Sequence, residues 1–407
     1  MSALQGIRVL EVASWTFVPA AGAILADWGA DVIKVEHPVT GDPQRALMTS
    51  GLLGPDGGNM INFMIEQPNR SKRSIGIDIG TPDGHALLLR LVKDSDVFLT
   101  NFLPSARKKL GIDVDEIRAA NPNIIYVRGH GQGANGPDAD RGAYDAAAFW
   151  SRGGIADSLS PADRAYPISQ GPGFGDLVGA QTIAGGIAAA LFKRERTGEG
   201  SIVDVSLLHT AMWLLSFGIV ASDTLGIELK TGGGKRSETP NPLVGFYKTG
   251  DDRYLTLVML QSDRYWEEFC QAIGRSDLIK DERFVDASAR QKNAAACVAA
   301  LDETFAGKTL AEWKDILAGI EGVWAPVQSQ LELLQDPQAI ENHYVMDVAT
   351  QDGQRSFKLV TNPVRFDDTP PTLTAAPELG QHTEEFLLEL GLAWEEIEAY
   401  KASGAIT

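Results

Sequence analysis

One acidic residue, Asp176, draws attention because of the glycines before it. It closes the run Gly-Pro-Gly-Phe-Gly-Asp at 171–176 and precedes an expected helix from Leu177 to about Arg194. An aspartate there can cap the helix by accepting a hydrogen bond from a first-turn amide. It can also be a nucleophile, because glycines let a ligand approach closely and a carboxylate can attack a thioester to form an anhydride. Amides at the helix N-terminus would then stabilise the oxyanion. The local sequence alone favours the cap.

A second glycine-rich run, Gly-Gln-Gly-Ala-Asn-Gly at 131–136, has the spacing of a dinucleotide-binding loop and follows an expected strand. The next residues, 137–142, form a poor helix, and the motif needs a helix to bind phosphate. A glycine-rich turn is therefore the better interpretation. The sequence also contains no Walker-type Gly-Lys-Ser, His-Glu-x-x-His, Cys-x-x-Cys or Gly-x-Ser-x-Gly motif. Phosphoryl transfer, a metal site and serine hydrolysis are unsupported.

The elements that must position Asp176 alternate between strands and helices. The pattern predicts strands at 7–12, 31–36, 96–100 and 124–127, with helices over 19–29 and 81–95. Thr81-Pro82-Asp83 is a good helix start, with a cap, a proline at the first position and an acid in the first turn. This alternation predicts right-handed crossovers and a largely parallel, Rossmann-like α/β sheet.

The remaining expected elements are less regular. The stretch 153–170 is expected to be a loop, 202–205 a short strand and 207–225 a deeply buried apolar helix. A linker or binding loop at 230–242 is followed by two strands around the turn at 249–252 and by helices at about 262–273 and 309–319. Strand 356–366 and a helix pair at 383–403, broken at Gly391, end the chain.

Length and charge limit the class of protein. The 407 residues favour two domains, and a net charge of −18 disfavours nucleic acid and anionic membranes as partners. No leader or run of about 18 apolar residues is found, so no membrane span is expected. The two cysteines, Cys270 and Cys297, are expected to be reduced and structural. We expect a cytoplasmic protein.

Several separated segments match one family in the family's order. They are Leu4-x-Gly6-Ile7-x-Val9-Leu10, the whole of 25–36, Gly41-Asp42-Pro43, Lys72-Arg73-Ser74-Ile75, Asn101-Phe102-x-Pro104, Gly175-Asp176, Arg196-Thr197-Gly198-x-Gly200 and Asn241-Pro242. In these segments the chain resembles the family III CoA-transferases, which include formyl-CoA transferase, carnitine CoA-transferase and the related α-methylacyl-CoA racemases. The likeness covers the first 242 residues and weakens beyond them.

The resemblance implies a fold and an assembly. It implies a large Rossmann-like domain from both chain ends, here 1–225 and 326–407, and a smaller α+β domain at 226–325. It also implies an interlocked homodimer.

The same resemblance implies an activity. It implies that CoA moves from an acyl-CoA to a free carboxylic acid, through an anhydride and then an aspartyl-CoA thioester on Asp176. No metal or other cofactor would be consumed, and acyl-CoA would be a substrate.

The family's binding residues carry over only where positions match. CoA would contact Ile77, Asp78, Ile79 and Gly80 near its nucleotide, and Asn101, Phe102 and Leu103 along its cleft. Lys109 matches a phosphate-binding arginine, whereas His37 and Gly80 replace basic residues, and Trp15 and Thr16 replace a valine and a glutamine near the active site. Gly232, Gly233 and Gly234 resemble a mobile loop that excludes water from the site; a plain linker is an equal alternative. Phe149 and Trp150 are candidates for an apolar acyl pocket or for the core.

Tyr144 and Asp145 separate the two branches of the resemblance. A racemase needs two acid–base groups, and its histidine would stand where this chain has Tyr144. A tyrosine with a pKa near ~10 is a poor base at neutral pH, and His130 lies upstream of that position. The transferase branch commonly has Tyr-Asp or Tyr-Glu here, so the resemblance favours a transferase, with Asp145 orienting the site or contacting Asp176. A racemase and an inactive acyl-CoA-binding relative remain as alternatives.

Overall fold

The computed structural model describes residues 2–48, 61–161, 164–228 and 235–407, and it divides the chain into two units. The first unit contains 1–159, 165–229 and 340–407, and the second contains 160–164 and 230–339. The first unit therefore uses both ends of the chain.

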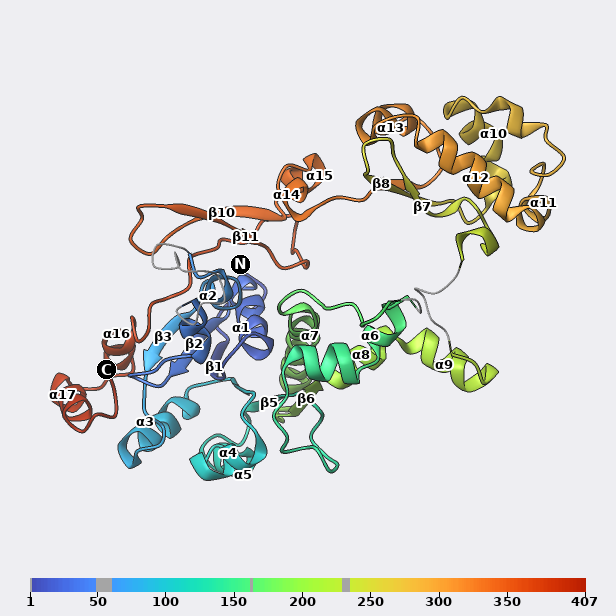
Figure 1. The fold of residues 1–407 in the computed structure, drawn as a ribbon. Helices are drawn as coiled ribbons and strands as arrows, with labels where there is room; N and C mark the ends of the chain where they lie inside the picture. Colours follow the sequence, from blue (N-terminus) through green and yellow to red (C-terminus); the bar gives the residue numbers. More distant parts are fainter. Residues whose placement is uncertain (1, 49–60, 162–163, 229–234) are drawn as a thin grey trace. The chain divides into compact units, whose positions relative to one another are not determined.

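A six-stranded sheet forms the centre of the first unit (Figure 1). Its strands are β1 (Arg8–Val12), β2 (Asp31–Glu36), β3 (Arg73–Gly76), β4 (Val97–Thr100), β5 (Ile125–His130) and β6 (Ile202–Ser206). They lie in the order β3-β2-β1-β4-β5-β6, and each neighbouring pair is parallel. The predicted parallel α/β sheet is confirmed. Its strand order reverses between β1 and β4, the position where such sheets bind ligands.

Up to residue 225 the first unit contains helices that include those covering the two faces of this sheet. They are α1 (Phe17–Asp27), α2 (Phe63–Asn69), α3 (Pro82–Lys93), α4 (Pro104–Leu110), α5 (Val114–Ala120), α6 (Ile155–Leu159), α7 (Phe174–Thr197), α8 (Leu207–Leu214) and α9 (Ser216–Leu225), with a 3-10 turn at Pro43–Met48 and a π-helix at Ala146–Arg152. Neighbouring strand residues alternate between two cores, since Val9 packs with α1 and α7 whereas Leu10 packs with α3 and α5.

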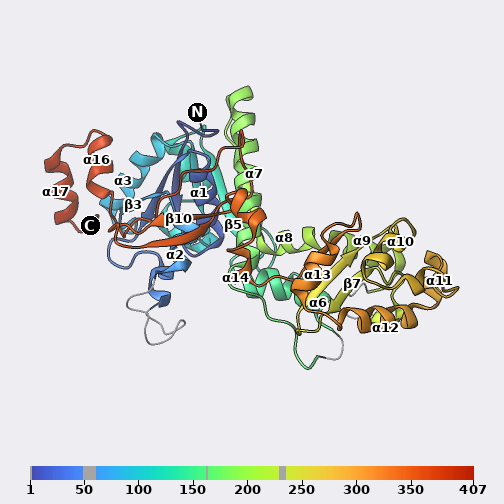
Figure 2. The same ribbon diagram turned by 90° about the horizontal axis from the view of Figure 1, so that it is seen from above.

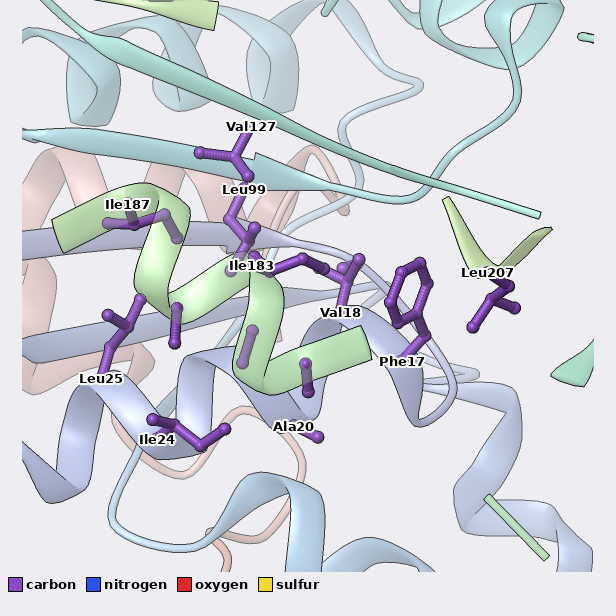
Figure 3. Packing of buried hydrophobic residues seen from close by; sticks show 14 of the residues in the cluster. Phe17, Val18, Ala20, Ile24, Leu25, Leu99, Val127, Ile183, Ile187 and Leu207 are labelled. Carbon is purple, nitrogen blue, oxygen red and sulfur yellow. The ribbon is translucent and has the colours of Figure 1, made fainter. Parts of the chain in front are cut away.

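The helices α1 and α7 pack closely against each other and against the sheet (Figure 3). Val18 and Leu25 of α1 meet Ile183 and Ile187 of α7 in one buried cluster. Glycine at 179 permits this approach, because a Cβ there would lie 2.4 Å from the ring of Phe17. By length and composition α7 is apolar enough to cross a membrane, but its buried side belongs to this core.

The C-terminal residues complete the second face of the sheet. Phe386, Leu387 and Ile397, from α16 (Thr383–Glu389) and α17 (Trp394–Ala402), join the core on the β3 side (Figure 2). Ile406 forms a β-bridge with Ile77. An antiparallel pair, β10 (Val345–Ala349) and β11 (Ser356–Val360), belongs to the same unit.

Two expectations for the first unit are wrong. The stretch 207–225 is not one deeply buried helix, since it breaks at Leu215 into α8 and α9, and α9 has no buried residue. The stretch 153–170 is not only a loop, because α6 lies within it. In both places the polarity of the segment did not correctly predict its burial or its secondary structure.

The second unit is a separate α+β structure. It contains a three-stranded antiparallel sheet of β7 (Val244–Lys248), β8 (Tyr254–Val258) and β9 (Trp324–Pro326). Its longer helices are α10 (Ser262–Ala272), α11 (Ala287–Lys292), α12 (Ala294–Phe305) and α13 (Leu310–Leu317). There are also 3-10 turns at Arg236–Glu238 and Ser276–Ile279, followed by the short helices α14 (Gln330–Leu333) and α15 (Pro337–Glu341). Cys270 and Cys297 are free and buried. Burial raises the pKa of each thiol to about 12, so neither is a reactive thiolate at neutral pH.

Candidate active site

A cavity of about 810 Å³ lies in the first unit at the carboxyl ends of the parallel strands. Side chains that follow β1, β2, β3, β4 and β5 line it, as expected for an open parallel sheet. Most of the predicted site residues lie on its wall: Trp15, His37, Ile77, Asp78, Ile79, Gly80, Asn101, Phe102, Leu103, Tyr144, Asp145 and Asp176. The structure thus brings into one cavity residues that are up to 161 positions apart in sequence.

Asp176 occupies the first turn of α7 and is not its cap. The helix begins at Phe174, and Gly173, with φ of 68°, precedes it. The alternative of a capping aspartate is therefore wrong by three residues. Glycine at 175 is required, because a Cβ there would lie 2.1 Å from the Phe149 ring. Phe149 is fully buried and Trp150 is 8% exposed. Neither lines the cavity, and both belong to the buried core that contacts α7.

Asp145 provides the cap that Asp176 does not. Its carboxylate accepts hydrogen bonds from the Gly175 amide, at 3.2 Å to Oδ1 and 3.1 Å to Oδ2. An anion at this point stabilises the positive end of the helix dipole. The expectation that first-turn amides stabilise an oxyanion is wrong for the Gly175 amide, because Asp145 already accepts its hydrogen.

Burial makes both carboxyl groups harder to ionise, and the charge of Asp145 adds to this cost for Asp176. Burial, and then the charge of Asp145, raise the pKa of Asp176 to about 7. Burial also raises the pKa of Asp145, and hydrogen bonds from Gln170 and from the amides of Gly175, Asp176 and Phe174 offset only part of that effect. The side chain of Asp176 makes no hydrogen bond or ion pair with any residue that the structure describes.

The loop between β1 and α1 forms another side of the cavity. Asn101 fixes it at Ser14, accepting from its amide at 3.1 Å and donating to its carbonyl oxygen at 2.7 Å. Asp42 Oδ1 accepts from the amides of Trp15 at 3.1 Å and Gln44 at 3.0 Å. Two sequence motifs of the resemblance, Asn101-Phe102 and Gly41-Asp42-Pro43, are thus used to hold this loop.

A cluster of buried charged side chains contacts the loop between β1 and α1 through Asp42. Lys34 Nζ lies 2.9 Å from Asp42 Oδ2 and 3.2 Å from Glu11 Oε1, and Lys72 Nζ lies 2.7 Å from Glu11 Oε2. Burial alone disfavours the Lys34 cation, but Asp42, Glu11 and Glu36 outweigh it and raise the pKa of Lys34. Each charge in the cluster therefore has an opposite partner, as buried charges require.

His37 and Gly80 face the end of the cavity where the nucleotide was expected. Amides of Val39 and Thr40 both donate to His37 Nδ1 at 3.2 Å, which places the proton of the neutral ring on Nε2. Nε2 lies 3.8 Å from Asp78 Oδ2, and Asp78 Oδ1 accepts from the Gly80 amide at 2.9 Å. His37 Nε2 is therefore a hydrogen-bond donor of a residue on the cavity wall.

Some predicted residues do not line the cavity. Thr16 is buried and donates to the Gln44 side chain at 3.1 Å. Lys109 is exposed in the last turn of α4 and is not on the cavity wall. Gly232, Gly233 and Gly234 lie outside the described residues.

Other lining residues were not predicted. His130 ends β5, and its Nε2 lies 3.0 Å from Asp204 Oδ1; Arg141, also on the wall, lies 3.7 Å from Asp138. The position of His130 at the carboxyl end of a parallel strand was the signal that could have found it. In the part of the chain that the structure describes, no group of three or more His, Cys, Asp or Glu side chains is placed to hold a metal ion.

Comparisons with known proteins agree on one family. The model of CoA-transferase family III matches residues 4–383. The (R)-2-hydroxy-4-methylpentanoate CoA-transferase of Clostridioides difficile is 32% identical, with 99% of each chain covered. The cinnamoyl-CoA:phenyllactate CoA-transferase of Clostridium sporogenes is also 32% identical, over 97% of this chain and 95% of the relative.

A solved structure is similar over the same length. It is a CAIB/BAIF family protein from Brucella suis, 30% identical, with a TM-score of 0.82 over 96% of this chain and 99% of that one. The agreement between sequence and fold extends through both units, because the matches cover nearly the whole chain.

Proposed function

Because this chain belongs to CoA-transferase family III, and so is an enzyme of the type that transfers CoA between acids, we propose that Asp176 is its nucleophile. The observation that carries the proposal is the place of Asp176. It is a partly buried carboxyl group on the wall of the large cavity, beside a second carboxylate. Its carboxylate makes no ion pair with described residues that would reduce its nucleophilicity.

The reaction has two symmetrical halves. A carboxylate oxygen of Asp176 attacks the thioester carbon of the donor, the C–S bond breaks, and CoA leaves as a thiolate. The thiolate then attacks the Asp176 carbonyl of the mixed anhydride, which releases the donor acid and leaves an aspartyl-CoA thioester. The acceptor carboxylate attacks this thioester and displaces CoA, whose thiolate finally attacks the acceptor's acyl carbon and frees Asp176.

No proton is gained or lost in this cycle. A histidine in place of Tyr144 is therefore unnecessary for the transfer. The raised pKa of Asp176 makes its ionised form more basic and so a better nucleophile, but only the ionised fraction reacts. A pKa of about 7 is a compromise between these two effects at neutral pH.

Asp145 acts in this proposal as a positioning residue. By accepting the Gly175 amide it fixes the first turn of α7 and hence the direction of Asp176. By its charge it keeps the neighbouring carboxyl group basic.

The CoA moiety is proposed to follow the carboxyl ends of the strands. Its nucleotide would lie near His37 and the segment 77–80, and its pantetheine arm beside Asn101, Phe102 and Leu103. Arg141 is a cation on this wall and can meet a phosphate, whereas Lys109 is displaced from it. The names of the two curated relatives supply the first acids to test, 2-hydroxy-4-methylpentanoate and phenyllactate.

We also propose a homodimer, interlocked as the family resemblance implies. Its support is an apolar surface on α8 and α9, where Trp213 is 74% and Phe217 is 90% exposed. Contiguous exposed apolar side chains of this size mark an interaction surface. Light scattering or sedimentation should give twice the mass of one chain.

A racemase is the second candidate, because His130 shares the cavity with Asp176 and is paired with Asp204. The pKa of about 7 for Asp176 would also suit proton transfer. The Tyr144 position argues against this role.

One pair of assays separates the candidates. The purified chain is incubated with acyl-CoA donors and free acids, and new thioesters are detected by mass; the transferase proposal predicts CoA exchange that requires both substrates. In deuterium oxide, a 2-methylacyl-CoA should keep its α-proton when no acceptor acid is present. Rapid exchange of that proton without CoA transfer would establish the racemase instead.

A further inference from the structure

Trp15 has a backbone conformation that tryptophan rarely adopts. Its φ is 69°, in the left-handed region, which is unfavourable for any residue with a Cβ. Such strain persists only where surrounding contacts impose it, and it concentrates at functional sites. The contacts around Trp15 therefore indicate what this loop presents to the cavity.

Those contacts come from the side chains of Asp42, which is buried, and Asn101, which is partly buried. Asp42 Oδ1 accepts the Trp15 amide, and Asp42 Oδ2 is held by Lys34 Nζ at 2.9 Å, with both charged side chains fully buried. Asn101 fixes Ser14, the residue before Trp15. The backbone at Ser14 and Trp15 is thus hydrogen-bonded to Asn101, which follows β4, and to Asp42 of the buried charged cluster.

The side chain that this backbone presents lies against Tyr144. The two rings meet edge to face, with centroids 5.3 Å apart and planes at 85°. Both line the cavity, and Tyr144 is 63% exposed. We call these two residues the aromatic pair.

The aromatic pair lines the same cavity as Asp176, the proposed nucleophile. Tyr144 precedes Asp145, whose carboxylate is bonded to the N-terminus of α7. On the other side, the Thr16 methyl lies 3.5 Å from where a Cβ on Gly173 would be, just before α7. An acyl group whose carbonyl carbon is attacked by Asp176 therefore begins in the cavity that this pair lines.

We propose that the aromatic pair is the surface on which the acyl group of the substrate packs, and that Asp42 is the positioning residue that holds Trp15 there. The inference rests on the proposed attack by Asp176, because that attack fixes where the acyl group begins. A branched or aryl acyl group can cover more of the exposed aromatic surface than an acetyl group, and binding strengthens with the apolar area covered. The pair thus selects for bulky apolar acids.

Binding can be measured apart from catalysis in the Asp176→Asn chain. Calorimetry with acetyl-CoA and 3-phenylpropanoyl-CoA gives the preference for the bulky acyl group as a ratio of dissociation constants. We expect this ratio to favour 3-phenylpropanoyl-CoA by about tenfold or more, since one covered ring face is worth about that factor. Adding Trp15→Gly should remove most of the preference and leave acetyl-CoA binding within about threefold.

Trp15→Gly suits the test because glycine adopts a positive φ without steric cost. The substitution therefore removes the indole and relieves the backbone strain at this position. Asp368→Gly is the matched control, since Asp368 is exposed, has φ of 52° and lies away from this cavity. Trp15→Ala keeps the strain and removes the ring, and it should change the ratio as Trp15→Gly does. Tyr144→Phe should preserve the ratio, and Tyr144→Ala should lower it.

The role of Asp42 has its own readout. Asp42→Asn retains an oxygen for the Trp15 amide and should keep the acyl preference, whereas Asp42→Ala should reduce it toward that of Trp15→Gly. A ratio within twofold of the parent in Trp15→Gly would overturn the inference. So would tighter binding of 3-phenylpropanoyl-CoA, because the indole would then obstruct the site. The CoA-exchange assay on the unsubstituted chain tests the proposed function separately. Absence of CoA exchange would contradict that function, whereas the binding ratios would still test whether the aromatic pair binds the acyl group.

Discussion

Glu36 and Asp176 are carboxyl groups on the wall of the same cavity, yet their surroundings are opposite. Glu36 is buried, but it accepts hydrogen bonds from Arg45 at 2.7 and 2.8 Å, from Ser74 at 2.7 Å and from the Asp42 amide at 3.0 Å. Burial disfavours its charge, but these partners and Lys34 lower its pKa to about 2. Asp176 has a like-charged neighbour instead, and its pKa rises to about 7.

The difference separates a structural carboxylate from a reactive one. Glu36 is ionised at any physiological pH, and its lone pairs are engaged, so it binds the loop at 41–45 to the sheet. Burial and the charge of Asp145 disfavour the ionised form of Asp176. In the proposed reaction, attack on a thioester removes this negative charge because the acyl derivative that forms is neutral. Perturbed carboxyl groups of this kind are typical of active sites.

The largest expected effect is on catalysis at Asp176. Asp176→Asn should lower the rate of CoA transfer by on the order of 10⁴-fold, as expected when a covalent nucleophile is removed. Asp83→Asn, an exposed acid in the first turn of α3, is the matched control and should retain full activity. Transfer by Asp176→Asn at more than a tenth of the parent rate would remove Asp176 from the mechanism.

The next largest effect is on stability at Glu36. Glu36→Gln removes the bidentate carboxylate partner of the partly buried Arg45, which should lower the free energy of unfolding by about 3 kcal/mol at pH 7. Because the folded pKa of Glu36 lies below its unfolded value, its contribution is present above about pH 4.5 and is lost as pH falls toward about 2. Denaturant titrations should therefore give a smaller difference in the free energy of unfolding between the two chains at pH 3 than at pH 7. A constant difference would contradict the ionic origin.

A smaller effect is expected in the pH dependence of transfer. With a pKa of about 7 for Asp176, kcat/KM should rise about tenfold per pH unit below pH 7 and level off above it. Asp145→Asn keeps an acceptor for the Gly175 amide and removes the like charge, so the midpoint should move to lower pH. An unmoved midpoint in Asp145→Asn, with the parent midpoint near 7, would show that burial alone perturbs Asp176.

The smallest expected effect is a gain of stability. The folded pKa of Asp176 lies above its ordinary value of 3.8, so its penalty is absent below about pH 4 and grows as pH rises to about 7. Asp176→Asn should thus raise the free energy of unfolding at pH 8 by roughly 1–2 kcal/mol, after allowance for its partial exposure to solvent. Thermal unfolding at pH 8 and pH 5 should show the gain chiefly at pH 8.

Sequence patterns predicted the sheet well because the strands that build it carry β-branched residues that are buried on both faces. The 31–36 strand, for example, was predicted at its observed bounds. The short strand at Arg73–Gly76 was missed because Lys72, Arg73 and Ser74 are polar and do not give the apolar pattern of a buried strand. Their polar side chains have distant partners: Lys72 and Ser74 donate to buried Glu11 and Glu36, and Arg73 pairs with Glu389 of α16. Such long-range partners are absent from any local pattern.

The site was predictable in its members but not in its geometry. Chain-wide resemblance identified Asp176, Asp145 and Asn101, but local sequence assigned the helix cap to Asp176, whereas Asp145, 31 residues earlier, provides it. The need for glycine at 175 follows from Phe149, and the strained Trp15 follows from Asp42. These are contacts between segments, and they exist only after the sheet has formed.

Trapping the proposed intermediate tests the central claim most directly. The chain is incubated with an acyl-CoA donor found active in the exchange assay, hydroxylamine is added, and the digested protein is analysed by mass spectrometry. We predict a hydroxamate on Asp176, dependent on the donor and absent in Asp176→Asn, because hydroxylamine opens both an anhydride and an aspartyl thioester. Sustained CoA transfer with no hydroxamate on Asp176, or with one on another residue, would contradict the account.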